Sequence, residues 1–179
     1  MTDYRRFYIP GSTWFFTVNL AERRDNRLLV ERIDELRVAF RYAKHRKPFR
    51  IDAVVILPDH LHCIWTLPPE DADFSTRWSL LKSRFSRAIP AGERISQSRS
   101  KRRERGLWQR RFWAHLLTGQ EDFNAHFDYI HWNPVKHGRV RRVADWPYSS
   151  FHRFVALGVY PMGWGHSGDF GIPPAACLE

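Results

Sequence analysis

The order of strand-like and helix-like segments is the feature that most restricts how this chain can fold. Runs rich in aromatic and β-branched residues are typical of strands, whereas apolar residues that recur every three or four positions indicate helices. Strand-like runs cover residues 14–20, 49–57, 61–67 and part of 107–117. Helix-like patterns cover residues 31–47, 78–89 and 118–132. The chain therefore alternates as strand, helix, two strands, helix, strand and a third helix.

Prolines and one capping pattern set the limits of the helices. The first helical pattern stops before Pro48 and the second stops before Pro90. Thr118 followed by Glu121 resembles a capping box, which predicts that the third helix starts there. Pro134 disfavours a helical conformation in the residue before it, so we expect this helix to end near Trp132.

The segment order matches the split βαβ arrangement, in which four antiparallel strands form one sheet. We therefore predict an α+β, ferredoxin-like (RRM-like) fold for residues 1–140, with two helices on one sheet face. The other face is left for an extra helix or a ligand. Residues 141–179 are predicted to add a C-terminal helical extension and an irregular, Gly- and Pro-rich tail, which is not an independent domain. Residues 91–106 carry almost no large apolar side chains, which predicts a mobile loop.

The charge of the chain indicates a polyanionic partner. Lys and Arg total 29 against 19 Asp and Glu, a net charge of +10. Residues 94–111 contain eight basic residues and one acid. Basic charge beside aromatic rings is typical of nucleic-acid surfaces, although a charged loop can also serve solubility alone. The candidate DNA-binding residues, including two from the basic leader, are Arg5, Arg6, Arg99, Lys101, Arg102, Arg103, Arg105, Trp108, Arg110 and Arg111.

His60 and His62 are candidate metal ligands. Residues two apart on a strand point to the same face, so both imidazoles would project together, while Leu61 and Cys63 point the other way. The spacing alone is weak evidence, because 9 histidines in 179 residues give about 0.4 such pairs by chance. Their position after an apolar strand and a Pro-Asp turn strengthens the metal hypothesis, since polar side chains there need a partner.

Tyr129 and Asn133 form a second candidate pair, on the third helix. Positions four apart share a helix face, and His126 lies on the same stripe. Taken alone, Tyr129 is as well explained as a half-buried tyrosine with its hydroxyl at the rim, and Asn133 as a residue that caps the helix end.

Two properties predict a cytoplasmic protein. Two cysteines make no disulfide framework, which favours a reducing compartment. The most apolar stretch, residues 53–57, is far shorter than the roughly 20 residues that a bilayer requires, and residues 2–8 lack the apolar run of a signal peptide. We expect no membrane partner.

Several motifs together resemble one family, the REP-associated tyrosine transposases, a branch of the single-tyrosine HUH transposases of bacteria. The resemblance covers the chain up to about residue 160. It rests on Arg5-Arg6 with Gly11, WFFTVNL at 14–20, VVILPDHLHCIW at 54–65, Leu107-Trp108-Gln109, DYIHWNPVKHG at 128–138 and DWPYSS at 145–150. The family often has Asn before the first histidine of the pair; here that residue is Asp59, which adds negative charge near the ion.

The resemblance implies an enzyme that cleaves and transfers DNA strands, with residues 1–140 as its catalytic domain. It implies that Tyr129 is the nucleophile and that His60, His62 and Asn133 bind a divalent ion, Mg²⁺ or Mn²⁺. The implied substrate is single-stranded DNA with palindromic hairpins. The protein is then expected near the nucleoid, as a monomer or a homodimer.

Two other functions remain open on the sequence alone. A non-catalytic RRM-like module shares this topology and also combines aromatic with basic residues. A metal-dependent phosphodiesterase without a covalent step would use the same histidines. A bound divalent ion would argue against the first alternative, and a protein–DNA adduct would argue against the second.

Overall fold

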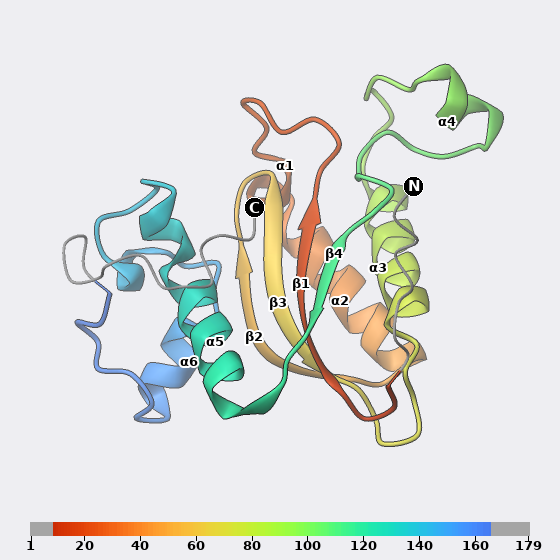
Figure 1. Cartoon of the computed structure of the whole chain (residues 1–179). Coiled ribbons are helices and arrows are strands. Elements are labelled where there is room, and N and C mark those ends of the chain that lie inside the picture. Colours follow the sequence, from red (N-terminus) through yellow and green to blue (C-terminus); the bar gives the residue numbers. More distant parts are fainter. Residues whose placement is uncertain (1–8, 166–179) are drawn as a thin grey trace, which may run out of the picture.

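The computed structural model describes residues 9–165 and shows one four-stranded sheet with helices on both faces (Figure 1). The strands lie in the order β2-β3-β1-β4, and every neighbouring pair is antiparallel. Their bounds are Thr13–Asn19 for β1, Arg50–Ile56 for β2, His60–Thr66 for β3 and Trp113–Leu116 for β4. The predicted ferredoxin-like sheet is confirmed, and the three longer strands begin and end within one residue of the predicted positions.

The helices follow the predicted order. The structure adds two short helices before residue 140 that the sequence pattern did not predict, Leu28–Glu31 and Gln97–Lys101. The helix bounds are Leu28–Glu31 for α1, Ile33–Arg46 for α2, Phe74–Ala88 for α3, Gln97–Lys101 for α4, Gly119–Lys136 for α5, Val143–Asp145 for the 3-10 helix η1 and Phe151–Ala156 for α6. Helix α4 falls in the segment for which the sequence predicts a loop. Within residues 9–165, no helix combines the length and the apolar composition that crossing a membrane requires.

Strand alternation divides the sheet side chains between two hydrophobic cores. Phe16, Cys63 and Trp65 point to the face covered by α2 and α3, where Trp65 stacks on Trp78 at 4.1 Å between ring centroids. Phe15 and its neighbours on the opposite side belong to a second core against α5 and α6. Burying each large apolar side chain contributes about 1.5–3 kcal/mol, so both faces add to stability. The sheet face that the sequence left open is covered by a helix.

Helix α5 is longer than the sequence predicted. It continues through Pro134 and ends at Lys136, four residues beyond the predicted end near Trp132. Proline removes one backbone donor, but Asn133, Pro134 and Val135 are all buried, and their packing offsets this loss. The predicted start at Thr118 is confirmed, but the predicted capping box is wrong. The carboxylate that accepts from the Thr118 N–H belongs to Asp122.

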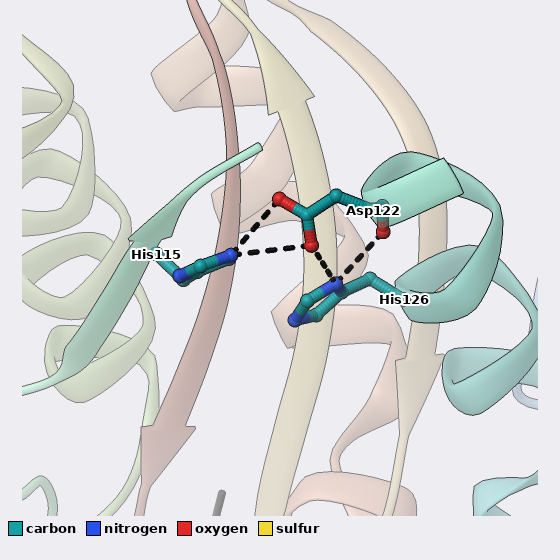
Figure 2. A group of neighbouring side chains, drawn as sticks. All are labelled: His115, Asp122 and His126. Carbon is teal, nitrogen blue, oxygen red and sulfur yellow. Dashed lines mark hydrogen bonds and ion pairs between the residues drawn. The ribbon is translucent and has the colours of Figure 1, made fainter. Parts of the chain in front are cut away.

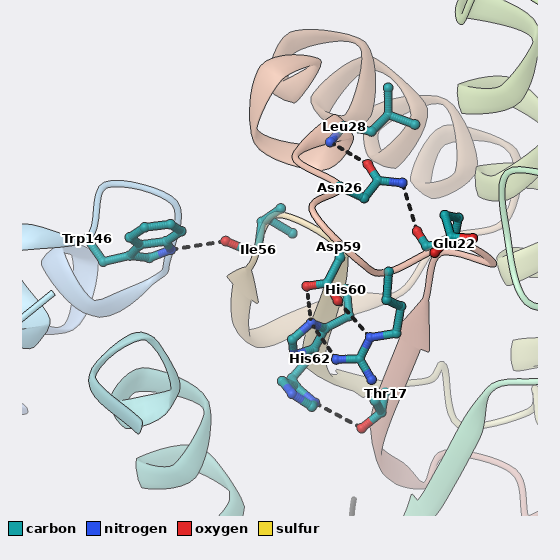
Figure 3. A network of polar contacts seen from close by, with 10 residues as sticks. Thr17, Glu22, Asn26, Leu28, Ile56, Asp59, His60, His62 and Trp146 are labelled. Atoms are coloured by element: carbon teal, nitrogen blue, oxygen red, sulfur yellow. Dashed lines mark hydrogen bonds and ion pairs between the residues drawn. The ribbon is translucent and has the colours of Figure 1, made fainter. Parts of the chain in front are cut away.

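The segment after α5 covers the free edge of β2. The backbone N–H of Ile56 donates to the carbonyl of Tyr148, and the N–H of Ser150 donates to the carbonyl of Val54. The indole N–H of Trp146 donates to the carbonyl of Ile56 at 3.0 Å (Figure 3). These bonds hold the C-terminal extension against the sheet, beside α5.

A buried polar network joins the same extension to α5. His131 Nε2 lies 2.8 Å from the hydroxyl of Ser150, which also accepts from the N–H of Val54. On its other side, the His131 ring contacts the hydroxyl of Tyr160, which donates to Asp128. Burial lowers the pKa of His131 to about 3, so its ring is neutral at physiological pH.

We expect Ser150→Ala to destabilise the fold by about 1–3 kcal/mol, because the change leaves the half-buried Val54 N–H and the buried Nε2 atom of His131 without this partner. Chemical denaturation measures the free energy of unfolding. The matched control is Ser79→Ala, an exposed serine of α3, which should change stability by less than about 0.5 kcal/mol. Equal effects of the two substitutions would mean that the network does not hold the extension.

Candidate active site

Strand β3 carries two imidazoles toward the sheet face that α5 covers. His62 lies opposite Thr17 of β1, whose hydroxyl is 2.9 Å from His62 Nδ1 (Figure 3). His60 Nδ1 lies 2.8 Å from a carboxylate oxygen of Asp59. The two rings are buried, with centroids 5.1 Å apart. The sequence prediction that they project together is confirmed, and Cys63 packs in the opposite core.

Asp59 fixes the orientation of His60, and the positive charge of Arg23 balances the negative charge of the Asp59 carboxylate. The Nε of Arg23 donates to Asp59 at 2.6 Å, and its Nη2 lies 3.3 Å from His60 Nδ1. Burial alone would raise the pKa of Asp59, but the hydrogen bonds and charges of His60 and Arg23 hold it well below its usual range. The carboxylate is therefore ionised and can only accept, which keeps the proton of a neutral His60 ring on Nδ1 and the lone pair on Nε2.

The loop between β1 and α1 positions Arg23. The side chain of Asn26 donates to the carbonyl of Glu22 at 2.8 Å and accepts from the N–H of Leu28 at 2.9 Å (Figure 3). The N–H of Leu20 donates to the carbonyl of Asp59, at the other end of this loop. The loop and the turn before β3 are thus held together beside His60.

Helix α5 brings Tyr129 to the histidine pair. The Tyr129 ring lies 5.4 Å from that of His62, between centroids, and only 4% of the residue is exposed. The ammonium of Lys136 donates to the Tyr129 hydroxyl at 3.1 Å and lies over its ring. A cation at this distance favours negative charge on the phenolic oxygen. The Tyr129 hydroxyl is thus held beside a cation and close to the histidine pair.

Asn133 lies midway along the sequence between two residues whose rings contact His60 and His62. Tyr129 and residue 137 are four positions before and after it, on the same helix face. Tyr129 contacts His62, and the ring of His137 lies 5.2 Å from that of His60. Asn133 is fully buried, and within residues 9–165 neither its amide oxygen nor its amide nitrogen makes a hydrogen bond.

These residues have the properties of a divalent-metal site. Burial is the main cause that lowers the pKa of His62 well below its usual value, and the electrostatic effects of its neighbours, including Lys136 and Arg23, act in the same direction. The His62 imidazole is therefore neutral, the form that binds metals. Among the described residues, His60 Nε2 is buried without a hydrogen bond. Imidazole nitrogens with an amide oxygen suit a divalent ion, so the residues present fit such a group.

The basic segment divides into structural and exposed residues. Arg105 binds Glu93 and the carbonyls of Ser86 and Ile89, while Arg99 donates to the carbonyls of Arg105 and Trp108. Trp108 is buried against Phe85, so its ring is not open to a stacked base. Arg110 pairs with Glu104.

Five of the predicted DNA-binding arginines line one open cleft, namely Arg99, Arg102, Arg103, Arg105 and Arg110. Arg102 and Arg103 are exposed and face α3 across a cleft that also contains Lys82 and Arg87. Lys101 and Arg111 are also exposed. Arg5 and Arg6 lie outside the described residues.

Sequence reasoning missed four residues of the site. Thr17 and Arg23 are more than 35 positions from the histidines that they contact, and nothing local marks them. Lys136 and His137 follow Tyr129 at helical spacing, a signal hidden by the expectation that the helix ends before Pro134.

Known proteins are similar to this chain over most of its length. Residues 13–133 match the family model described as "Transposase IS200 like". The REP-associated tyrosine transposase of Escherichia coli strain K12 is 48% identical over 171 residues, which cover 95% of each chain. A Haemophilus influenzae protein is 44% identical over 173 residues, covering 96% of this chain and 98% of its own.

A solved structure gives the same result. A REP-associated tyrosine transposase bound to a REP hairpin superposes with a TM-score of 0.81 at 46% identity, and the match covers 97% of each chain. Family model, sequence identity and three-dimensional similarity extend over both the histidine strand and the tyrosine helix. The chain belongs to the IS200-like transposases and, within them, to the REP-associated tyrosine transposases.

Proposed function

We propose that this transposase cleaves and rejoins single-stranded DNA beside hairpins, with Tyr129 as the nucleophile and a 5′-phosphotyrosine as the intermediate. The observation that carries the proposal is the position of Tyr129, whose ring contacts that of His62 and whose hydroxyl accepts from the Lys136 ammonium. The relative that binds a REP hairpin supports the same class of substrate here.

The reaction follows from the chemistry of these groups. The oxygen of Tyr129 loses its proton and attacks phosphorus, while the bond from phosphorus to the 3′ oxygen breaks. The leaving oxygen takes up a proton and becomes a free 3′-hydroxyl. The new phosphotyrosine is a diester, so a second 3′-hydroxyl can attack it and rejoin the strand without ATP. Lys136 offsets the negative charge that develops on the Tyr129 oxygen.

His60, His62 and Asn133 are the residues that would hold a divalent ion, Mg²⁺ or Mn²⁺. When bound, such an ion polarises the scissile phosphate and offsets its charge. Asp59 holds the His60 ring in the orientation that presents Nε2, as carboxylates behind metal-binding histidines commonly do. Arg23 balances the added carboxylate. The Arg23–Asp59 pair therefore adds no net charge beside the ion.

Two further features of the chain are part of the proposal. The exposed Arg102 and Arg103 contact phosphates of the hairpin or of the strand beside it. The bonds of the C-terminal extension to β2 and α5 support treating residues 1–140 as the catalytic domain and the later residues as its extension.

We expect Tyr129→Phe to fold and bind hairpin DNA like the parent but to form no covalent adduct, because the change removes the hydroxyl alone. DNA labelled on the 3′ side of the break should migrate with the parent protein in a denaturing gel, and DNA labelled on the 5′ side should run free. The control is Tyr42→Phe, an exposed tyrosine of α2. An adduct in Tyr129→Phe would assign the nucleophile elsewhere, with Tyr148 and Tyr160 next to test.

We expect His60→Ala and His62→Ala each to abolish cleavage and to remove one equivalent of bound Mn²⁺, since each variant lacks a ligand, while much of the DNA affinity remains. Calorimetric titration with Mn²⁺ measures the stoichiometry. His152→Ala removes an exposed histidine of α6 and should retain the parent value. Unchanged Mn²⁺ binding in both site variants would contradict the assignment.

Replacement of Arg102 and Arg103 by Ala should weaken DNA binding broadly across sequences. It should also flatten the plot of log affinity against log salt by about 0.7 for each phosphate of a single strand that these arginines neutralise. Arg105 is left intact because its hydrogen bonds are structural. The pair Arg41→Ala and Lys44→Ala, on the exposed side of α2, removes the same charge elsewhere. An equal slope in the two double variants would mean that the cleft does not bind phosphates.

A further inference from the structure

Three side chains that can bind metals meet where β4 joins α5, outside the site described above. His115 extends from β4, and Asp122 and His126 come from successive turns near the start of α5 (Figure 2). His115 Nε2 lies 3.1 Å from Asp122 Oδ2, and His126 Nδ1 lies 3.0 Å from Asp122 Oδ1. One ligand atom from each residue lies within 4.8 Å of the other two.

The surroundings keep Asp122 and His126 in the protonation states that metal binding requires. Burial alone would raise the pKa of Asp122, but the Thr118 N–H and the ring of His115 hold it below its usual value, so the carboxylate is ionised. Burial lowers the pKa of His126, which keeps this imidazole neutral. His126 is only 4% exposed, and its ring stacks on that of His115 with centroids 4.8 Å apart.

We propose that His115, Asp122 and His126 form a second divalent-metal site, suited to a transition-metal ion such as Zn²⁺. Two imidazoles and one carboxylate are a ligand set that zinc favours. Bonds of about 2.0–2.1 Å to a tetrahedral zinc place neighbouring ligand atoms about 3.3 Å apart, close to the 3.1 Å and 3.0 Å that separate Asp122 from the two rings. His126 Nδ1 also lies 2.9 Å from the main-chain oxygen of Asp122, so metal binding through Nδ1 requires the ring proton to move to Nε2 and the ion to replace this contact.

This site is distinct from the histidine pair on β3. The ring of Phe15 lies between the two, with centroids 4.7 Å from His126 and 5.5 Å from His62. The two ligand sets share no residue. The side chain of His115 is 36% exposed, so a fourth ligand, such as water or a phosphate oxygen, can reach the ion. Bound metal would cross-link β4 to the helix that carries Tyr129, three residues after His126.

The test uses the full chain with both catalytic histidines replaced, His60→Ala and His62→Ala, so that it does not depend on the proposed function. Calorimetric titration with Zn²⁺ should show one equivalent in this background. Adding Asp122→Asn, which keeps the shape of the side chain, or His115→Ala should remove it. Adding His45→Ala and His152→Ala, two exposed histidines, should not.

Thermal melting without metal checks that each variant folds, and zinc should raise the melting temperature only where His115, Asp122 and His126 are intact. If Asp122→Asn does not fold, His115→Ala carries the test, because His115 is partly exposed. Absence of zinc binding in the background protein, or binding that survives both substitutions, would overturn the proposal and leave the cluster as a hydrogen-bonded connection between β4 and α5.

Discussion

The antiparallel pairing of β1 with β3 is the interaction on which the rest of the structure depends. Its register places Thr17 opposite His62 and Phe16 opposite Cys63. A shift of one residue would turn every side chain of a strand to the other face. His62 would then lie in the apolar core under α2 and α3, and Cys63 would face Tyr129. The site therefore exists because two aromatic strands, fixed by the cores on both faces, pair in this one register.

Helix α5 is the second requirement, and it is held from several sides. The sheet contacts it through Phe15, the C-terminal extension contacts it through the network at His131, and Asp122 accepts from the backbone at its start. The position of Tyr129 depends directly on the position of the helix that carries it. The many contacts of α5 explain why a helix that contains Pro134 can present Tyr129, Asn133 and Lys136 from one rigid element.

The local sequence pattern, together with the family motif, predicted the fold and half of the residues of the candidate site. The strands and the helices α2 and α3 follow from apolar periodicity, and His60, His62 and Tyr129 follow from spacing and from the family motif. Thr17 and Arg23 could not be predicted, because their contacts arise from strand pairing and loop packing. Composition also gave no way to separate Arg105 and Trp108, which serve the fold, from Arg102 and Arg103, which are exposed. Residues of one type in one segment look alike until the chain is folded.

The edge of β2 has a consequence for how copies of this protein can associate. A strand at the edge of a sheet normally presents free backbone groups to which another chain can add a strand. Here the extension already occupies that position, because Ile56 donates to Tyr148 and Val54 accepts from Ser150. Assembly by continuing the sheet from one molecule into the next is therefore blocked on this side, and within residues 9–165 the other edge of the sheet is the short strand β4.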